Sequence, residues 1–463
     1  MTEATRAGKA PPGEGSPPRS YAASVGPFSG TMMVVGGIIG SGIFLNPAIV
    51  AQRVRSVELT LLAWVLGGII AVIGALVYAE LGARRPLAGG GYVYLRDAYG
   101  KLPAFLYAWT LLLVIATGAI AAVAVTFASY TTALLGLGPA ARIPLAVGAI
   151  VLLSGINYLG VRPGTITQNV FTVLKLSALA CLIVAGLASP HRPTAGPGAG
   201  VMEGGSVILA LGAAMVPVLF SYGGWQQTNF VAQELIEPEK NLPRALIFGV
   251  AIVVAVYLLA NLAYLRALGL DGLAASSAPA ADSMEILLGA KGRTFIAAGI
   301  AISTFGFLNL VILVSPRVYQ TMASDGLFFP SLARLHPRYR TPSGAIVFQG
   351  IWAIILTVTG RYGDLLDYVV FGDWIFFGAT AATLFLFRAR ERAGRERANI
   401  RFRMWGHPLG TTIFVLAAVY VVGGSIASNP GNALKGTALI LLGVPVFRWW
   451  YKRRPMIPTG DMD

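Results

Sequence analysis

The sequence predicts an all-α polytopic membrane protein, on the basis of its composition, its apolar segments and its charge distribution. Of the 463 residues, 56% are hydrophobic and only 12% are charged, with a mean hydropathy of +0.69. Soluble domains carry about 25% charged residues, so most of this chain is expected to lie in lipid. A membrane-spanning helix needs roughly 20 apolar residues, and we delimit about twelve such segments.

The apolar segments follow one another with short polar connections. The first ten form a core at residues 26–389, and a basic cytoplasmic loop at 390–407 separates it from two accessory helices at 408–451. Residues 1–25 and 452–463 are predicted to be cytoplasmic tails, the first of them disordered, because neither has an apolar core. The predicted spans are residues 27–50, 58–83, 104–135, 143–160, 166–188, 205–233, 243–268, 294–323, 343–360, 364–388, 408–428 and 432–450.

The first and sixth segments are interrupted by glycine near their middles, at Gly40-Ser41-Gly42 and at Ser221-Tyr222-Gly223-Gly224. Glycine is less favourable than alanine in a helix by about 1 kcal/mol, so these clusters favour unwinding. Unwound backbone at membrane depth survives only where protein or a water-filled cavity surrounds it. Two breaks in corresponding halves of a chain indicate a substrate site near the bilayer midplane, which is typical of transporters.

Unwound segments expose backbone N–H groups, which carry a partial positive charge, and C=O groups, which carry a partial negative charge. N–H groups at the start of a half-helix attract an anion, and C=O groups at the end of one attract a cation. We therefore expect Gly40, Ser41 and Gly42 to receive a carboxylate, and carbonyl groups near Ile38 and Phe220 to receive an amine. A zwitterionic amino acid fits this pair of breaks, although an inorganic ion or a nucleobase would use the same geometry.

The basic residues are distributed as in a membrane protein whose termini both face the cytoplasm. Most of the 35 Lys and Arg residues fall on segments that would then lie inside, with the densest run from Arg388 to Arg403. This positive-inside bias predicts a multi-pass protein of the cell membrane, either inner or plasma membrane. It also accounts for the net charge of +15, so nucleic-acid binding is not expected. The single cysteine, Cys181, and the three histidines form no metal-ligand pattern, so neither a metal nor another cofactor is expected.

Several motifs in register resemble the amino acid–polyamine–organocation superfamily, and within it the L-type amino acid transporters and their bacterial relatives. They are GGIIGSGIF at 36–44, YAELGARRPLAGGGYVYLRDAYG at 78–100, FSYGGWQQTNFVAQELIEPEKNLPRA at 220–245 and SPRVYQTMASDGLFFP at 315–330. The resemblance extends over most of the chain. It implies the inverted repeat of five plus five helices found in LeuT-like transporters, with the first and sixth helices unwound.

Lys175 lies within the fifth predicted span, where insertion of a charge costs roughly 2.5–3.5 kcal/mol. The resemblance places it where sodium-driven relatives bind a cation, with its ammonium linking the first broken helix to the eighth span. It therefore implies transport without sodium. The alternative is a lysine that snorkels to the cytoplasmic end of its span.

The resemblance also assigns roles around the second break. An aromatic residue at the position of Phe220 closes over the substrate as an outer gate, and Gln226 stands where relatives often carry Asn. Trp225 either contributes to the site or packs in the core. The predicted substrate-binding residues are Ile38, Gly40, Ser41, Gly42, Phe220, Ser221, Gly223, Gly224, Trp225 and Gln226.

Asp373 and Asn309 are further polar candidates within spans, as a substrate or proton site. A carboxylate in the tenth span, where L-type relatives often have Asn, needs a partner or a proton. Asp373 is expected to pair with Lys175, to bind the substrate amine or to titrate, unless it lies in water at the outside end of its span. In the eighth span, the serine that relatives place near the lysine corresponds to Val311.

Sodium-independent amino acid transport by alternating access, as exchanger or facilitator, is the function these observations favour. Neutral substrates are favoured because Asp373 is the only evident anionic site for a cationic side chain. Proton-coupled symport, transport of cationic amino acids or amines, and an amino-acid-binding sensor or channel remain as alternatives, and an enzyme is not expected. Relatives bound to a heavy chain carry a cysteine in the loop at 134–143, and this chain has none, so no disulfide-linked accessory glycoprotein is expected.

Overall fold

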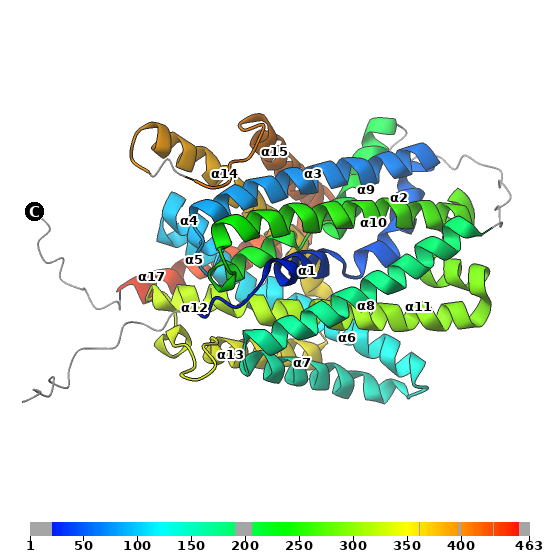
Figure 1. Ribbon diagram of the computed structural model, residues 1–463, viewed down its shortest axis with the longest axis horizontal. Helices are drawn as coiled ribbons and strands as arrows, with labels where there is room; N and C mark the ends of the chain where they lie inside the picture. Colours follow the sequence, from blue (N-terminus) through cyan, green and yellow to red (C-terminus); the bar gives the residue numbers. More distant parts are fainter. Residues whose placement is uncertain (1–20, 190–205, 361, 397–399, 429, 453–463) are drawn as a thin grey trace, which may run out of the picture.

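The computed structural model of the chain describes residues 21–189, 206–360, 362–396, 400–428 and 430–452. Most of the helices run roughly along one direction and form an elongated bundle (Figure 1). The helices are α1 (Pro27–Ile38), α2 (Gly42–Val54), α3 (Val57–Arg84), α4 (Gly91–Tyr99), α5 (Lys101–Thr110), the π-helical η1 (Leu111–Ile115), α6 (Ala116–Leu134), α7 (Arg142–Tyr158), α8 (Val161–Ala188), α9 (Val207–Ser221), the 3-10 helix η4 (Trp225–Glu234), α10 (Pro238–Ala275), α11 (Pro279–Val314), α12 (Pro316–Ser324), α13 (Ser343–Thr359), α14 (Tyr362–Arg392), α15 (Leu409–Ser428), α16 (Pro430–Leu441) and α17 (Gly443–Lys452), with short 3-10 turns η2 (Pro139–Ala141) and η5 (Pro330–Ala333).

The lengths and composition of these helices confirm the predicted fold class. Within the described residues, nine helical segments are long and apolar enough to cross a membrane, and the bent pair α1–α2 makes ten. α13 is apolar but shorter, and α14 packs against α15. The total of twelve spans, the inverted repeat and the division into core and accessory helices stay predictions.

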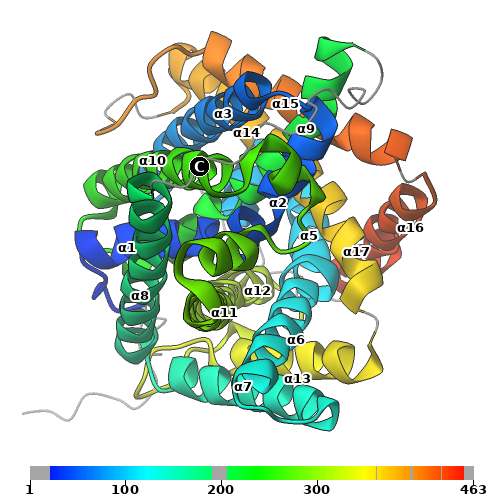
Figure 2. The same ribbon diagram turned by 90° about the vertical axis from the view of Figure 1, so that its right-hand side faces the viewer.

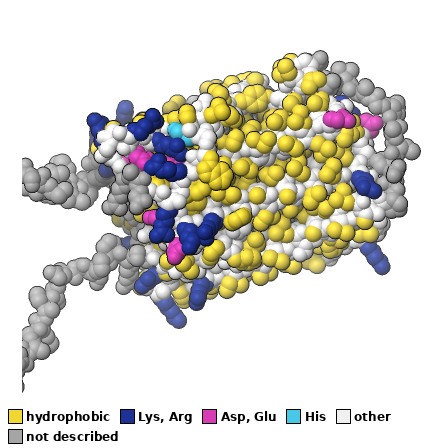
Figure 3. Space-filling view, turned by 45° about the horizontal axis from the view of Figure 1, so that its top comes forward, with side chains coloured by type: hydrophobic (Ala, Val, Ile, Leu, Met, Phe, Trp, Pro, Cys, Tyr) yellow, Lys and Arg dark blue, Asp and Glu magenta, His cyan; other side chains and the backbone are white. Residues whose placement is uncertain are grey.

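Apolar and charged side chains occupy different parts of the bundle surface, as expected for a membrane protein. Hydrophobic side chains cover the middle of the face seen in Figure 3, and most of its Lys and Arg side chains gather at one end. Figure 1 shows α4, α12 and α17 at that same end. Figure 2 looks along the bundle and shows α16 and α17 on its outside, close to α5. Lipid can solvate the apolar belt but not the charged end.

Both predicted glycine interruptions are breaks in the structure. α1 ends at Ile38 and α2 begins at Gly42, with a bend of 43° between them. α9 ends at Ser221, and the chain resumes as the 3-10 helix η4 after Gly224, whose φ of +107° favours glycine. The sixth span therefore changes helix type at its break.

The two breaks touch each other, and glycine makes that contact sterically feasible. A Cβ atom added to Gly224 would lie 2.1 Å from the carbonyl oxygen of Gly37. One added to Gly42 would lie 2.7 Å from Oγ of Ser221. Gly40 is different, because an added Cβ would meet only the ring of Phe307 at an ordinary 3.7 Å.

Several connections differ from the sequence prediction. α10 is longer than the span predicted at 243–268, and α11 begins before the span predicted at 294–323 and ends at Val314. Both helices continue past a break, at Gly269 and at Gly289, where φ is positive. Residues 21–25, predicted to belong to a disordered tail, lie against the bundle: the N–H groups of Ser24 and Val25 donate to the carbonyl of Glu234 at 2.9 Å. The rest of the predicted tails, 1–20 and 453–463, lies outside the described residues.

We expect Gly224→Ala to destabilise the fold by several kcal/mol. A non-glycine residue at this φ costs about 1–3 kcal/mol, and the clash with Gly37 adds an overpacking cost of similar size. Gly155→Ala in α7 is the control, because nothing lies within 4 Å of its added Cβ. Thermal unfolding in detergent, followed by tryptophan fluorescence, should show a large loss for Gly224→Ala alone. Equal midpoints for the two variants would contradict the steric argument.

Candidate transport site

A cavity of about 290 Å³ lies between the two breaks. Its walls come from both broken spans, from α5, η1 and α6 on one side, and from α11 and α14 on the other. This volume suits a small metabolite rather than a drug-sized ligand. The predicted site residues that line it are Ile38, Gly40, Ser41, Gly42, Phe220, Ser221, Gly223, Gly224, Gln226 and Asp373.

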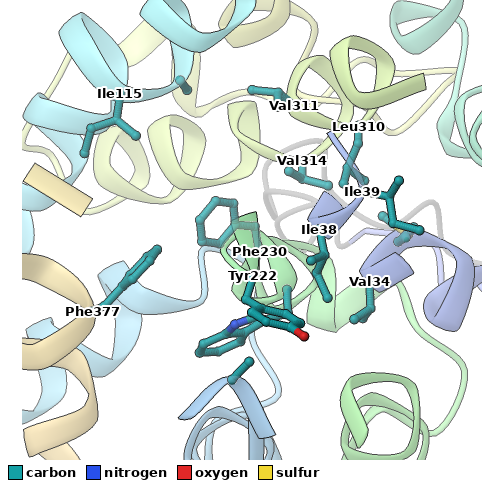
Figure 4. Packing of buried hydrophobic residues seen from close by; sticks show 14 of the residues in the cluster. Val34, Ile38, Ile39, Ile115, Tyr222, Phe230, Leu310, Val311, Val314 and Phe377 are labelled. Carbon is teal, nitrogen blue, oxygen red and sulfur yellow. The ribbon is translucent and has the colours of Figure 1, made fainter. Parts of the chain in front are cut away.

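Part of the cavity wall is apolar. Figure 4 shows Ile115, Phe230, Val311 and Phe377 around the open space, and all four line the cavity. They come from four different elements: η1, η4, α11 and α14. A substrate side chain in contact with these residues would be held by burial of apolar surface.

The start of α2 presents backbone N–H groups at the cavity. The first N–H groups of any α-helix have no partner within the helix, and Ser41 gives α2 no side-chain cap. The N–H of Gly40 does have a partner, the carbonyl of Ile38 at 2.9 Å. The N–H groups from Ser41 onward are therefore better placed than that of Gly40 to receive an anion.

Tyr257 of α10 is a polar group at the breaks that the sequence did not reveal. Its hydroxyl lies 3.0 Å from the carbonyl oxygen of Ile38 and 3.2 Å from that of Ser221. One side chain thus reaches the C-terminal end of both half-helices. The carbonyl oxygen of Ile38 therefore accepts from both the Tyr257 hydroxyl and the N–H of Gly40, which together use its two lone pairs.

A second group of contacts joins α2 to α9. Nδ2 of Asn46 lies 2.7 Å from Oγ of Ser221 and 3.0 Å from the carbonyl oxygen of Pro217. Pro217 has no N–H to give to the carbonyl of Ala213 one turn earlier. The guanidinium of Arg53 donates to that carbonyl instead. In the sequence, these contacts between α2 and α9 were indicated only by an asparagine and a proline within apolar segments.

Lys175 is fully buried behind the first break, outside the cavity lining. Its Nζ lies 2.7 Å from the carbonyl oxygen of Ile39 and 3.1 Å from that of Gly36. Ser303 of α11 donates to the same Ile39 oxygen at 3.3 Å. The lysine amino group therefore points into the protein and does not snorkel to water. Ser303 thus shares a carbonyl acceptor with the lysine, whereas Val311 lines the cavity.

Asp373 is the only charged side chain among the cavity-lining residues. Within the described residues, no ion pair joins it to Lys175, so the predicted pairing of the two is not found. The carboxylate lines the cavity, whereas the lysine lies behind the first break.

Two other predicted residues are turned away from the cavity. Trp225 is 3% exposed and packs edge-on against Tyr78, with ring centroids 4.9 Å apart. Asn309 is bonded within a buried polar cluster, where it lies 3.1 Å from Oε1 of Gln168 and 3.0 Å from Nδ2 of Asn157. Neither lines the cavity, so their contacts are those of core residues.

The cavity is closed at the basic end of the bundle. Arg317 and Glu234 form a buried ion pair with two contacts, at 2.7 and 3.2 Å. Nearby cavity residues Ser315 and Phe230 are 1% and 2% exposed. Phe220, in contrast, is 41% exposed, so its ring does not cover the opposite side. The structure is therefore open toward the end where α9 begins.

Paired half-helices around a small cavity in a membrane bundle define a transporter architecture, and the sequence match gives its class. The chain belongs to the amino acid permease family, which matches residues 25–445. The predicted superfamily is thereby confirmed.

The chain is similar to particular transporters along most of its length. It is 34% identical over 435 residues to the human "Large neutral amino acids transporter small subunit 2", covering 91% of this chain and 79% of that protein. It is also 34% identical over 429 residues to the mouse "b(0,+)-type amino acid transporter 1", covering 91% of this chain and 86% of that protein. Because the first is named a small subunit, the comparison does not support the predicted absence of an accessory partner.

Glu234→Gln is expected to destabilise this conformation by about 3–5 kcal/mol, because it leaves the Arg317 charge buried without its partner. Glu285→Gln is the matched control, since its ion pair with Arg293 is largely exposed and such pairs contribute about 0–1 kcal/mol. Thermal unfolding in detergent measures both. A Glu234→Gln variant as stable as Glu285→Gln would show that the pair does not hold the basic end closed.

Proposed function

We propose that this chain is a sodium-independent amino acid transporter that works by alternating access. The observation that carries the proposal is the cavity between two helix breaks that touch each other. Each break offers unwound backbone to the same small space, which allows one zwitterion to contact both.

The substrate carboxylate would bind at the N–H groups of Ser41 and Gly42, where the half-helix dipole is positive. The substrate amine would bind carbonyl oxygens at the ends of α1 and α9, and at that of Ile38 it would replace the Tyr257 hydroxyl. A neutral side chain would then lie against apolar residues such as Ile115 and Phe377. This arrangement favours neutral amino acids.

Lys175 supports operation without sodium. Its ammonium lies between two carbonyl oxygens of the first broken span, and Ser303 of α11 contacts one of them. Carbonyl and hydroxyl oxygens are the ligands that a sodium ion would use. A covalently attached cation at this point would hold α1 near α11 without a bound ion.

Asp373 favours a second candidate, a transporter that also takes cationic amino acids or amines. A desolvated carboxylate attracts an ammonium or guanidinium group more strongly than water-exposed carboxylates do. The same carboxylate is the candidate for a proton site if transport is coupled to protons.

The proposed orientation places the basic end of the bundle in the cytoplasm, by the positive-inside rule. The described chain begins and ends at that end, as Figure 1 shows. The cavity would then face outward, and inward opening would require the Arg317–Glu234 pair to separate. We also expect no disulfide-linked partner, because the single cysteine, Cys181, lies within α8.

Proteoliposomes loaded with unlabelled leucine should take up labelled leucine faster than empty ones, and equally fast in sodium and choline buffers. Trans-stimulation separates a transporter from a channel or a sensor. A requirement for sodium would contradict the proposed role of Lys175, while absence of uptake of any amino acid would contradict transport itself.

Lys175→Met should reduce uptake at least tenfold. The variant leaves the carbonyl of Gly36 without its ammonium and that of Ile39 with only Ser303, and an unsatisfied buried acceptor costs about 1–3 kcal/mol. Lys101→Met, at the exposed start of α5, is the control with the same change of side chain. Gel filtration verifies that both variants fold. Equal uptake by folded Lys175→Met would remove the lysine from the mechanism.

Asp373→Asn should weaken competition by arginine against leucine uptake roughly tenfold, which corresponds to about 1.4 kcal/mol. Competition by unlabelled leucine should change little, because its side chain carries no charge. Asp271→Asn, outside the cavity lining, is the control. If arginine competes with leucine uptake neither in the wild-type protein nor in Asp373→Asn, the cavity is restricted to neutral substrates.

A further inference from the structure

A second hollow lies on the flank of the bundle, away from the transport cavity. It has a volume of about 520 Å³, and all of its lining residues are apolar or aromatic. They come from α5, η1, α13, α17 and the connection between α12 and η5. We call it the α17 groove, lined chiefly by Trp109, Phe328, Phe329, Phe348, Val446 and Trp450.

Aromatic contacts between three elements give the α17 groove its shape. The ring of Trp450 lies 5.1 Å from that of Phe329 and 6.1 Å from that of Phe328, and Phe328 lies 6.0 Å from Phe348. Phe328 is 5% exposed, whereas Phe329 is 45% exposed. One ring is thus fixed in the wall and its neighbour forms the rim. A surface packed in this way is formed before any ligand arrives.

The connection between α12 and α13 mixes Pro, Arg and aromatic residues. The structure has only the 3-10 turn Pro330–Ala333 there, and the two phenylalanines before it belong to the groove. Tryptophan and other aromatic side chains concentrate where hydrocarbon meets headgroups. The groove therefore lies at the depth where an acyl chain meets its headgroup.

Basic side chains flank the groove on α17. Arg448 and Lys452 are both exposed and are four residues apart, so they share one side of the helix. Each lies three residues after a lining residue, Pro445 or Trp449, which places both cations beside the groove. Within the described residues, neither forms an ion pair with an acidic side chain. Arg334 directly follows η5 in the sequence.

We propose that the α17 groove binds an anionic phospholipid from the leaflet at the basic end of the bundle. One acyl chain lies between the aromatic walls, and the phosphate is held by Arg448 and Lys452. The combination of an all-apolar hollow with adjacent cations matches an amphiphile whose head is negative. A second copy of this chain fits less well, because a symmetric contact would bring the two cationic patches together.

The test uses the full chain purified in detergent, with a photoreactive phosphatidylglycerol that carries its reactive group on the acyl chain. Labelled peptides are identified by mass spectrometry, and a phosphatidylcholine of the same structure is the comparison. Phosphatidylglycerol should label the segments around Phe329 and Trp450 in preference to phosphatidylcholine. Native mass spectrometry of the same sample reports retained lipids and the oligomeric state.

Arg448→Gln and Lys452→Gln should each weaken phosphatidylglycerol retention about fivefold, the factor expected for one basic residue near a charged lipid surface. Lys291→Gln, at an exposed basic residue of α11 just after its break at Gly289, is the control and should retain the lipid. Val446→Trp should fill the groove and abolish labelling with Arg448 and Lys452 intact, and amino acid uptake shows that it still folds.

Three results would overturn the proposal. The first is equal labelling by phosphatidylglycerol and phosphatidylcholine that Arg448→Gln leaves unchanged. The second is labelling that maps elsewhere and survives Val446→Trp. The third is a lipid-free dimer with cross-links between copies at α17, which would assign the groove to protein contact.

Discussion

The contact between the two helix breaks is the constraint on which the rest of this structure depends. The carbonyl of Gly37 faces Gly224 so closely that a single methyl group at Gly224 would fill the space, and Gly42 meets Ser221 in the same way. Because the breaks touch, the broken ends of four helical segments (α1, α2, α9 and η4) converge on one small volume. That volume is the cavity, and unwound backbone contributes to its polar groups beside side chains such as Gln226 and Asp373. A site built from backbone can bind the groups that all amino acids share, and it leaves the side chain to be recognised by neighbouring residues.

Unwinding two helices in a membrane exposes backbone groups that need new partners. The structure supplies them with side chains from neighbouring spans. Tyr257 reaches carbonyls of both breaks, Lys175 takes two carbonyls of the first, and Arg53 takes the carbonyl that Pro217 leaves without a donor. These contacts satisfy part of the broken backbone from behind and leave the start of α2 uncapped toward the cavity. The same arrangement therefore provides both stability and a binding site.

The two ends of the bundle are built differently, and the difference fits a transporter caught open on one side. At the basic end, charged side chains are buried in pairs, such as Arg317 with Glu234 and Arg84 with Glu80. Buried ion pairs stabilise the closed end. Separating them is costly, because it leaves desolvated charges without their partners. At the other side Phe220 is 41% exposed, and its ring leaves the cavity open. The aromatic and basic surface beside α17 lies outside this machinery and faces the lipid.

The sequence by itself determined where the helices break and that Lys175 lies inside a span, because glycine content, hydropathy and an isolated charge are local properties of the chain. It also determined the family, since the motifs around Gly40 and Gly223 are contiguous. Only the tertiary structure decided which side chains meet those breaks. It brought Tyr257 and Asn46 to the site, turned Trp225 and Asn309 away from it, and set Ser303 beside the lysine. The reason is that these spans are apolar on every side, so their sequences carry little record of which face turns inward. Rotation of each helix about its axis is fixed by packing between segments far apart in the chain, and that packing exists only in the folded protein.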